Sequence, residues 1–388
     1  ILKVVEDLLI KNVKMIFPDS IIPGSVIIQK DKIYKIFLNH TPRYEGESLD
    51  GENLYLSPGF IDIHIHGAYG HDTMDATSEG LVEISKALLK HGVTSFLPTT
   101  MTCSKEDIRN AIKNVSEVMK NKTTVNNILG VHLEGPFINK NKMGAQNPNY
   151  RLDPSVESFK EICEDYEEII KIVTLAPELE GAKELIKYLN DKGIVASIGH
   201  TDAKYEEAME GIKNGVSHAT HLFNAMTPFN HRDPGSVGAI LNSNITAECI
   251  LDGIHIHYAS LELALKLKSS DKIILITDAM SACCMKDGKY SLGGQDVIVK
   301  DSAARLESGV LAGSVLTLDK AVRNVKNNLN VPLNEIIKLL TINPAKVCGV
   351  NRTKGLIKEN YDADLILFDE DINIKHTFIN GKKTESIS

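Results

Sequence analysis

The sequence predicts an α/β protein whose largest part is a (β/α)8 barrel of the TIM type. Eight short apolar runs typical of strands lie between residues 60 and 277. Several of these runs are separated by segments in which apolar residues recur at helical spacing. Strands that alternate with helices in this way favour a parallel barrel. The alternative is a doubly wound open sheet, which is disfavoured because no GxGxxG turn follows the first strand.

The expected elements follow in chain order. The strands are expected at residues 60–65, 93–97, 128–133, 172–176, 194–198, 216–219, 246–251 and 273–277. A helix is expected after Ser104, a good N-cap residue, because apolar residues from Ile108 to Met119 fall on one face. A second helix is expected over 205–212, after Asp202. A hairpin over 290–299 interrupts the pattern, and two amphipathic helices, over 316–329 and 332–340, complete it.

Both ends of the chain look β-rich. Residues 26–28 and 33–37 are typical of short strands around a turn, residues 363–368 form an apolar run, and Asn380-Gly381 is a hairpin turn signal. The ends are therefore expected to meet in a small β-sandwich domain made of residues 1–57 together with 352–388. The catalytic barrel domain would then span residues 58–351.

Composition limits the possible partners and location. The chain has 388 residues, 43% of them hydrophobic, and a formal net charge of −8. An acidic surface argues against nucleic acid or an anionic membrane as partner, although a local cation can still bind a phosphorylated small molecule. No apolar run is long enough to span a membrane, and no signal-peptide pattern is seen. Six cysteines without CxxC spacing predict reduced thiols and a cytoplasmic location, and the pair Cys283-Cys284 is interpreted as small apolar filler.

The most informative string is PGFIDIHIHG, residues 58–67. Alternate side chains of a strand share a face, so His64 and His66 point the same way. Two imidazoles on one face at the C-terminal end of a strand form half of a metal site. The alternative is two polar residues where a strand leaves the core.

Similar residues recur at the other strand ends, where barrel enzymes hold their active sites. His132 and Glu134 close the third strand, His200 follows the fifth, His218 and His221 lie at the sixth, and Asp278 follows the eighth. His200 alone could be a core histidine. His218 and His221 point to opposite faces of an extended segment, so one is structural, and His221 is favoured as functional because it lies closer to the loop. Burying Asp278 unpaired would be costly, which favours a catalytic or ligand role.

This set of residues predicts metal-assisted hydrolysis. Imidazole together with carboxylate suits Zn²⁺, Fe²⁺, Mn²⁺ or Co²⁺. Such an ion makes water a better nucleophile and polarises a carbonyl group. Asp278 could then take a proton from the water and pass it to a leaving group.

The motifs resemble those of the amidohydrolase superfamily and, more narrowly, the N-acetylglucosamine-6-phosphate deacetylase family. They are PGFIDIHIHG (58–67), HLEGP (132–136), SIGHTD (197–202), HATHLFNAM (218–226), DGIH (252–255), TDAM (277–280) and LAGS (311–314). They follow the family's order through nearly the whole chain. The resemblance implies hydrolysis of the acetamide of N-acetyl-D-glucosamine 6-phosphate, which yields D-glucosamine 6-phosphate and acetate in amino-sugar metabolism.

The resemblance also implies residue roles and one or two divalent ions. Glu134, His200 and His221 would bind the main ion, and His64 and His66 a second, with Glu134 bridging. Asp278 would be the catalytic acid/base. The positions that match substrate contacts are Ala145, Asn224, Ala225, Arg232, His255, Leu311, Ala312 and Gly313. Arg232 would reach the sugar phosphate across a homodimer interface, and Gln146 stands where some members have histidine, which leaves its contact open.

Two other functions remain as alternatives. One is a cyclic-amide or dipeptide hydrolase of the same superfamily. Those enzymes often use a carboxylated lysine on the fourth strand, and residues 172–177 have no lysine at the strand mouth. The other is a metal-free scaffold protein, a class that usually loses the ligands that this chain retains.

Overall fold

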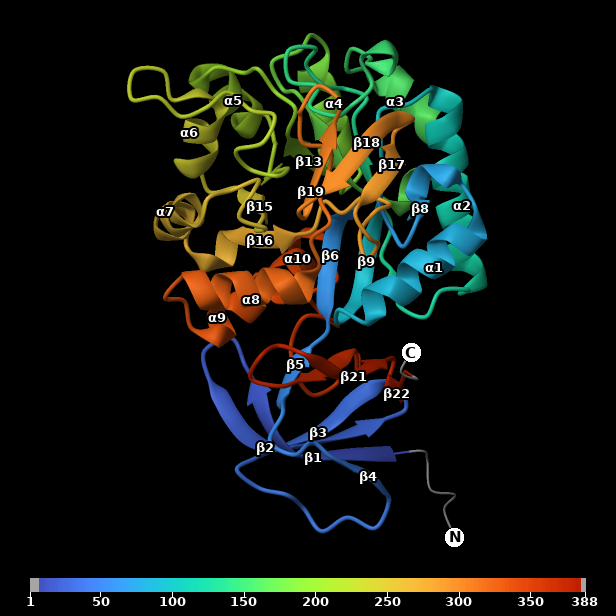
Figure 1. The fold of residues 1–388 in the computed structure, drawn as a ribbon, viewed down its shortest axis with the longest axis vertical. Coiled ribbons are helices and arrows are strands. Elements are labelled where there is room, and N and C mark those ends of the chain that lie inside the picture. Colours follow the sequence, from blue (N-terminus) through green and yellow to red (C-terminus); the bar gives the residue numbers. More distant parts are fainter. Residues whose placement is uncertain (1–6, 385–388) are drawn as a thin grey trace.

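The computed structural model describes residues 7–384, which form a parallel barrel stacked on a smaller β-sheet along the long axis of the molecule (Figure 1). The barrel strands are β6 (Phe60–Ile65), β9 (Val93–Thr100), β11 (Val131–Glu134), β12 (Ile170–Leu175), β13 (Val195–Ile198), β14 (His218–Ala219), β15 (Thr246–Ile250) and β16 (Ile273–Ile276), all paired in parallel in this order. The segment after β16 returns to β6, where Ile65 bridges Ala279. The ring of strands is thereby closed, and the predicted fold class is confirmed.

Each predicted barrel strand has a counterpart, and one of them is divided. The run predicted at 128–133 becomes β10 (Asn127–Ile128), at the edge of β9, and β11. Gly130 between them has a φ of +144°, which an L side chain rarely adopts. A glycine therefore separates two short strands where the apolar run predicted one.

Helices cover the outside of the barrel (Figure 1). They are α1 (Ser78–Leu89), α2 (Lys105–Asn121), α3 (Val156–Cys163), α4 (Ala182–Asp191), α5 (Tyr205–Lys213), α6 (Gly235–Leu241), α7 (Tyr258–Lys268), α8 (Leu318–Asn328), α9 (Leu333–Lys338) and α10 (Ile342–Val347), with 3-10 turns at Thr73–Asp75, Pro148–Tyr150, Glu164–Ile169 and Ser270–Lys272. Ser104 caps α2 as predicted, since its hydroxyl accepts the Asp107 N–H. Asp202 does not cap α5; it accepts from Asn141 instead. Over residues 7–384, no helix combines the length and apolarity that a membrane span requires.

Two insertions lie over the C-terminal mouth of the barrel. The first is the short hairpin of β7 (Gly67–Ala68) and β8 (His71–Asp72). The second is an antiparallel sheet of β17 (Gly288–Leu292), β18 (Gln295–Lys300) and β19 (Ala303–Leu306). The predicted hairpin is therefore present with a third strand added. Its apolar face packs against Met101, Ala145 and Met280, beside the strand ends.

The smaller sheet unites both ends of the chain. Its strands are β1 (Asp7–Ile16), β2 (Ile21–Gln29), β3 (Lys32–Leu38), β4 (Glu47–Asp50), β5 (Tyr55–Pro58), β20 (Leu365–Phe368), β21 (Ile374–Ile379) and β22 (Lys382–Lys383). They form one hydrogen-bonded sheet, in which β1 pairs along one edge with β2 and along the other edge first with β4 and then with β5. β5 and β20 join the two chain ends, with Pro58 opposite Leu365. Residues 1–6 and 385–388 of the expected small domain lie outside the described residues.

Candidate metal centre and active site

Five ligand-type side chains meet at the C-terminal mouth of the barrel. β6 carries His64, His66 directly follows β6, β11 ends in Glu134, and His200 and His221 follow β13 and β14. All five are buried, with at most 5% of any residue exposed. Their ligand atoms form two groups suited to a metal ion, and Glu134 belongs to both.

Glu134 lies between two pairs of imidazoles. Its Oε1 is 3.2 Å from Nε2 of His200 and 3.0 Å from Nε2 of His221. Its Oε2 is 3.2 Å from Nε2 of His66, and Nε2 of His64 is 3.5 Å from Oε1. One carboxylate therefore faces all four rings.

The tautomers of three histidines follow from their other ring nitrogens. Nδ1 of His66 donates to the Thr99 carbonyl at 3.2 Å, and Nδ1 of His200 donates to the Lys142 carbonyl at 2.8 Å. Nδ1 of His64 lies 2.9 Å from Glu248. In its neutral form, each ring presents the lone pair of Nε2 to the cluster, which is the arrangement of metal-binding histidines.

The residues present fit a divalent cation. Nε2 of His200 and Nε2 of His221 are only 3.1 Å apart, and Nε2 of His64 is buried without a hydrogen-bond partner among residues 7–384. Buried lone pairs without a partner are costly unless a cation satisfies them. A donor set of four imidazoles and one carboxylate suits Zn²⁺, Fe²⁺, Mn²⁺ or Co²⁺.

The carboxylates favour positive charge inside the cluster. Burial opposes the charged form of His66, but Asp278 and Glu134 raise its pKa to about 10. In the same way, Glu134, Glu248 and Asp278 raise the pKa of His64 well above its usual value against the effect of burial. A metal ion would have to displace such protons, so metal affinity should rise with pH.

Asp278 completes the cluster from the segment after β16. Its Oδ1 lies 3.2 Å from Nε2 of His66 and 3.5 Å from Nε2 of His64. Burial raises its pKa, but the two imidazoles outweigh burial and lower it overall, so the group is a carboxylate. Asp278, His200 and His221 have positive φ values of 50°, 47° and 32°. This backbone costs non-glycine residues roughly 1–2 kcal/mol each and tends to cluster at functional sites.

Glu248 on β15 is a site residue that the sequence analysis missed. Its Oε2 accepts from the His64 ring and, at 3.2 Å, from the His221 backbone N–H. Its Oε1 is 3.1 Å from Nε2 of His218. The sequence contained one signal for it, an acidic residue inside the apolar run 246–251. A fully buried carboxylate requires partners, so this residue could have been predicted to contact other polar side chains.

The remaining histidines near the site support the framework. The structure places His221 beside Glu134, whereas His218 binds Thr246 and Glu248. His132 donates to the Ile63 carbonyl and accepts from Thr174. Burial lowers the pKa of His132 to about 3, so this ring is neutral.

Gln146 contacts the central carboxylate. Its amide nitrogen donates to Oε2 of Glu134 at 2.6 Å, and its amide oxygen accepts the Thr102 N–H at 2.7 Å. Thr102 therefore fixes the orientation of the amide. The contact that the sequence left open is a hydrogen bond that holds Glu134.

A cavity of about 350 Å³ opens onto the cluster. Six of the predicted substrate residues line it: Ala145, Asn224, Ala225, His255, Leu311 and Gly313. Ala312 does not line the cavity, because its side chain is buried against the sheet of β17, β18 and β19. Arg232 is exposed and also lies outside the lining of this cavity. Arg305 was not predicted but lines the cavity from β19.

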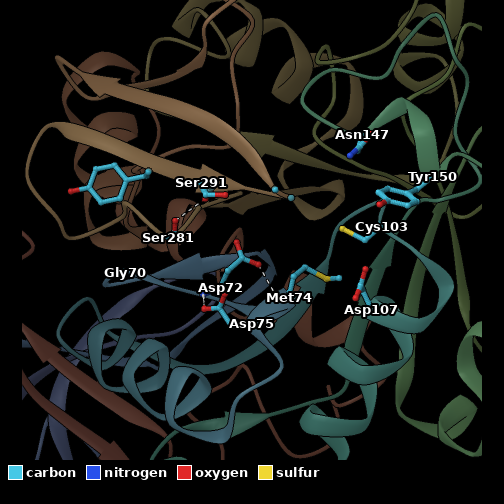
Figure 2. A pocket seen from close by; sticks show the side chains of 13 residues that line it. Gly70, Asp72, Met74, Asp75, Cys103, Asp107, Asn147, Tyr150, Ser281 and Ser291 are labelled. Atoms are coloured by element: carbon cyan, nitrogen blue, oxygen red, sulfur yellow. Dashed lines mark hydrogen bonds between the residues drawn. The ribbon is translucent and has the colours of Figure 1, made fainter.

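A larger cavity of about 780 Å³ lies beside the first, between the two insertions. Figure 2 shows Asp72 and Asp75 on one side of it and Asp107 on the other, with Met74 between them. None of the predicted site residues lines it. Three carboxylates and, among the described residues, no lysine or arginine line it, whereas the smaller cavity contains the metal-ligand cluster and Arg305, so the smaller cavity is the better candidate for the active site.

Replacing Glu248 by glutamine should weaken metal binding about 10- to 100-fold, which is the usual effect of losing a group that orients a ligand. The neutral amide keeps the size of the side chain but removes the charge that faces His64 and the His221 N–H. Equilibrium dialysis against Zn²⁺ measures the effect. Glu262→Gln, on the exposed face of α7, is the control, and equal affinity of the two variants would contradict the role of Glu248.

The chain is similar to known proteins over nearly its whole length. The model of the amidohydrolase family matches residues 55–384. The chain is 40% identical over 376 residues to N-acetylglucosamine-6-phosphate deacetylase of Lysinibacillus sphaericus, with 97% of each chain covered. The crystal structure of the deacetylase from Pasteurella multocida is 31% identical, with a TM-score of 0.92 over 97% of this chain and 99% of that chain. A mutant of the Mycobacterium smegmatis enzyme in complex with N-acetyl-D-glucosamine-6-phosphate is 28% identical, with the same TM-score and coverage.

Proposed function

Because this chain belongs to the amidohydrolase family, we infer that it hydrolyses the acetamide of N-acetyl-D-glucosamine 6-phosphate to D-glucosamine 6-phosphate and acetate. The observation that supports this reaction best is the position of Asp278, which contacts the cluster of four histidines and Glu134. Asp278 and Glu134 both line the same cavity. The similarity over 97% of the chain to deacetylases of this sugar phosphate specifies the substrate.

The residues of the cluster have separate tasks in this reaction. Glu134, His200 and His221 would hold the main ion, and His64 and His66 would hold a second ion together with Glu134. When bound, a divalent ion lowers the pKa of water and polarises the amide carbonyl. Asp278 accepts a proton as the water oxygen attacks the carbonyl carbon. It then donates that proton to the sugar nitrogen as the C–N bond breaks, so that acetate and the free amine form.

The assay that tests this function measures acetate release from N-acetylglucosamine 6-phosphate, with the unphosphorylated sugar, a cyclic amide and a dipeptide as comparison substrates. We expect the phosphorylated sugar to have the highest kcat/KM. A higher value for the cyclic amide or the dipeptide would assign the site to the alternative amide hydrolases. Metal analysis of the purified protein tests the metal-free scaffold alternative.

We also propose a cytoplasmic homodimer in which Arg232 binds the substrate phosphate of the neighbouring subunit. The six cysteines are all free, as is usual in reducing compartments. Arg232 lies in the loop before α6, which projects from the outer side of α5 and α6 (Figure 1). In the same loop, Phe229 is 62% exposed. A cation that lies outside its own cavity, beside an exposed aromatic ring, suits a contact with another subunit.

Arg232→Ala should lower kcat/KM for the phosphorylated sugar roughly 10- to 100-fold, the value of a charge-assisted phosphate contact. The unphosphorylated sugar should be affected little, and Arg232→Lys should recover only part of the loss because it lacks the planar fork. Arg305→Ala is the comparison, since Arg305 lines the cavity within its own chain. If Arg305→Ala selectively lowers kcat/KM for the phosphorylated sugar and Arg232→Ala does not, then Arg305 and not Arg232 makes the phosphate contact.

Mixing inactive Asp278→Asn protein with Arg232→Ala protein tests the contact across the interface. In a mixed dimer, one site pairs an intact Asp278 with an intact Arg232 from the other subunit. We expect activity above that of either variant alone after subunit exchange. Exchange without this gain contradicts the contribution from the neighbouring subunit.

A further inference from the structure

Outside the active-site cavity, an exposed cysteine forms a Cys–His–Asp arrangement. Sγ of Cys284 lies 3.4 Å from Nε2 of His91, and Nδ1 of His91 lies 2.9 Å from Oδ1 of Asp319. Arg323, one turn further along α8, binds the other oxygen of Asp319. A nucleophile, a basic ring and a group that orients the ring are the parts of an activated thiol.

The surroundings favour the thiolate of Cys284. Hydrogen bonds from the thiol of Cys283, whose Sγ is 3.8 Å away, and from His91 lower the pKa of Cys284 to about 5 against the opposing effect of partial desolvation. Burial opposes the charge on His91, but Asp319 and Cys284 raise its pKa to about 9. Thiolate and imidazolium therefore coexist through the neutral range.

The other cysteines differ from Cys284 in exposure and in the direction of the pKa shift. Cys163, Cys249, Cys283 and Cys348 are buried, Cys103 is half-buried, and Cys284 alone of the six is exposed. Burial raises the pKa of Cys103 to about 11 and that of Cys249 to about 12. The sequence-based interpretation of the pair as apolar filler holds for Cys283 and is wrong for Cys284.

A cavity of about 230 Å³ adjoins the thiol and is lined by two lysines. Its lining consists of Tyr69, Glu83, Lys86, Ala87, Lys90, His91 and Cys284. Glu83 is paired with Lys86 at 2.7 Å. The His91 imidazolium is paired with Asp319 and with the Cys284 thiolate, whereas Lys90 has no ion-pair partner within residues 7–384, so Lys90 is the charge that remains to attract an anion.

We propose that Cys284 is a modification site at which a thiolate held by His91 exchanges with small disulfides that carry carboxylates and dock in this cavity. The thiolate attacks one sulfur of the disulfide, so that its S–S bond breaks as a new bond to Sγ of Cys284 forms. The displaced thiolate takes the proton of the His91 imidazolium. The small disulfide is the oxidant, and one molecule of thiol leaves for each adduct.

The modified residue is connected to the active site by backbone hydrogen bonds. The Cys283 carbonyl accepts from Tyr69 at 2.8 Å, and the Ala279 carbonyl accepts from His66 at 2.9 Å. Asp278 precedes this segment directly. An adduct on Cys284 should therefore displace the segment that positions Asp278 and His66, and so lower activity.

The first test follows the rate of adduct formation with pH in the metal-loaded protein, by intact-mass measurement with dithiodipropionate. Between about pH 6 and about pH 8 an ordinary thiol becomes roughly 75-fold more reactive through ionisation, whereas Cys284 should change less than about twofold. The charged and titratable groups around the thiol are Cys283, His91, Asp319, Arg323, Tyr69, Glu83, Lys86 and Lys90. An ordinary pH profile in the native protein overturns the proposal.

Variants separate Cys284 from the other thiols and define the role of His91. Cys284→Ser should abolish the rapid adduct, and Cys103→Ser should leave it unchanged. His91→Asn should slow the reaction about tenfold at pH near 6 and steepen its pH profile, an effect that loss of stability alone would not produce. Rapid modification that persists in Cys284→Ser overturns the assignment.

Charge in the cavity is tested with two disulfides of similar size. Dithiodipropionate is anionic and should react faster than the cationic cystamine, and salt should reduce the difference. Lys90→Glu should reverse the preference. Equal rates for both reagents in the native protein would overturn the carboxylate preference.

The effect on activity rests on the proposed deacetylase function, whereas adduct mass does not depend on it. Acetate release should fall in proportion to the adduct and return after reduction with dithiothreitol. Cys284→Ser protein should keep its activity under the same treatment. An adduct with unchanged acetate release would overturn the coupling to the active site, and failure of acetate release in untreated protein would instead count against the proposed function.

Discussion

Replacing Asp278 by asparagine should lower kcat roughly 100- to 10,000-fold while metal content and fold remain, because general acid–base catalysis typically contributes this much. The carboxylate stands 3.2 Å from Nε2 of His66, and the imidazoles keep it deprotonated against the effect of burial. An amide of the same size fills the space but cannot accept the proton of the attacking water.

The measurement compares acetate release, metal content and thermal unfolding of the variant with those of the native protein. Asp296→Asn is a matched control, since Asp296 lies exposed on the inserted β18. Loss of kcat with normal metal content supports proton transfer by Asp278. A near-native kcat would remove Asp278 from the mechanism, and loss of metal together with kcat would make it a ligand.

The barrel could be predicted because its signals are local. Most barrel strands lie in apolar runs a few residues long, and the period of two places His64 and His66 on one face without any knowledge of the fold. The pattern was less informative where apolar content is low. β19 has only four residues, one of which is Arg305, so its sequence is not distinct from that of a loop. The position of Arg305 on the cavity was therefore not predicted.

The site was predictable where a residue stands at a strand end and less so where it depends on contacts across the barrel. Glu248 lies inside a strand, and its link to His64 spans 184 positions of the chain. Gln146 lies in an irregular loop, where no periodicity indicates which way a side chain points. Cys284 meets His91 across 193 positions, a pairing that no local pattern contains.

Contact geometry also distinguishes residues that the motifs group together. Leu311 and Gly313 line the active-site cavity, but Ala312 between them packs in the apolar cluster beneath the sheet of β17, β18 and β19. Consecutive residues of an extended segment point to opposite sides, so a motif of three consecutive residues cannot place all its side chains on one ligand. A contact from Ala312 would have to come from its backbone.

Replacing Glu134 by glutamine should have the largest effect on metal binding, because this carboxylate serves both groups of histidines. Its two oxygens lie 3.0–3.2 Å from Nε2 of His66, His200 and His221. The amide would lose the negative charge that attracts a cation, and its N–H₂ would face imidazole nitrogens. Losing a metal ligand should lower metal affinity by more than the roughly 10- to 100-fold that follows the loss of a group that only orients a ligand.

Thermal unfolding with and without added Zn²⁺ measures metal binding without relying on turnover. A ligand at 100 times its Kd stabilises the folded state by about 2.7 kcal/mol, so native protein should gain stability on metal addition. Glu134→Gln should gain almost none at the same concentration, and Glu248→Gln should gain an intermediate amount. This order follows from the structure, since Glu134 contacts the proposed ion directly and Glu248 acts through His64 and His221. Equal stabilisation of the native protein and Glu134→Gln would place the metal elsewhere in the fold.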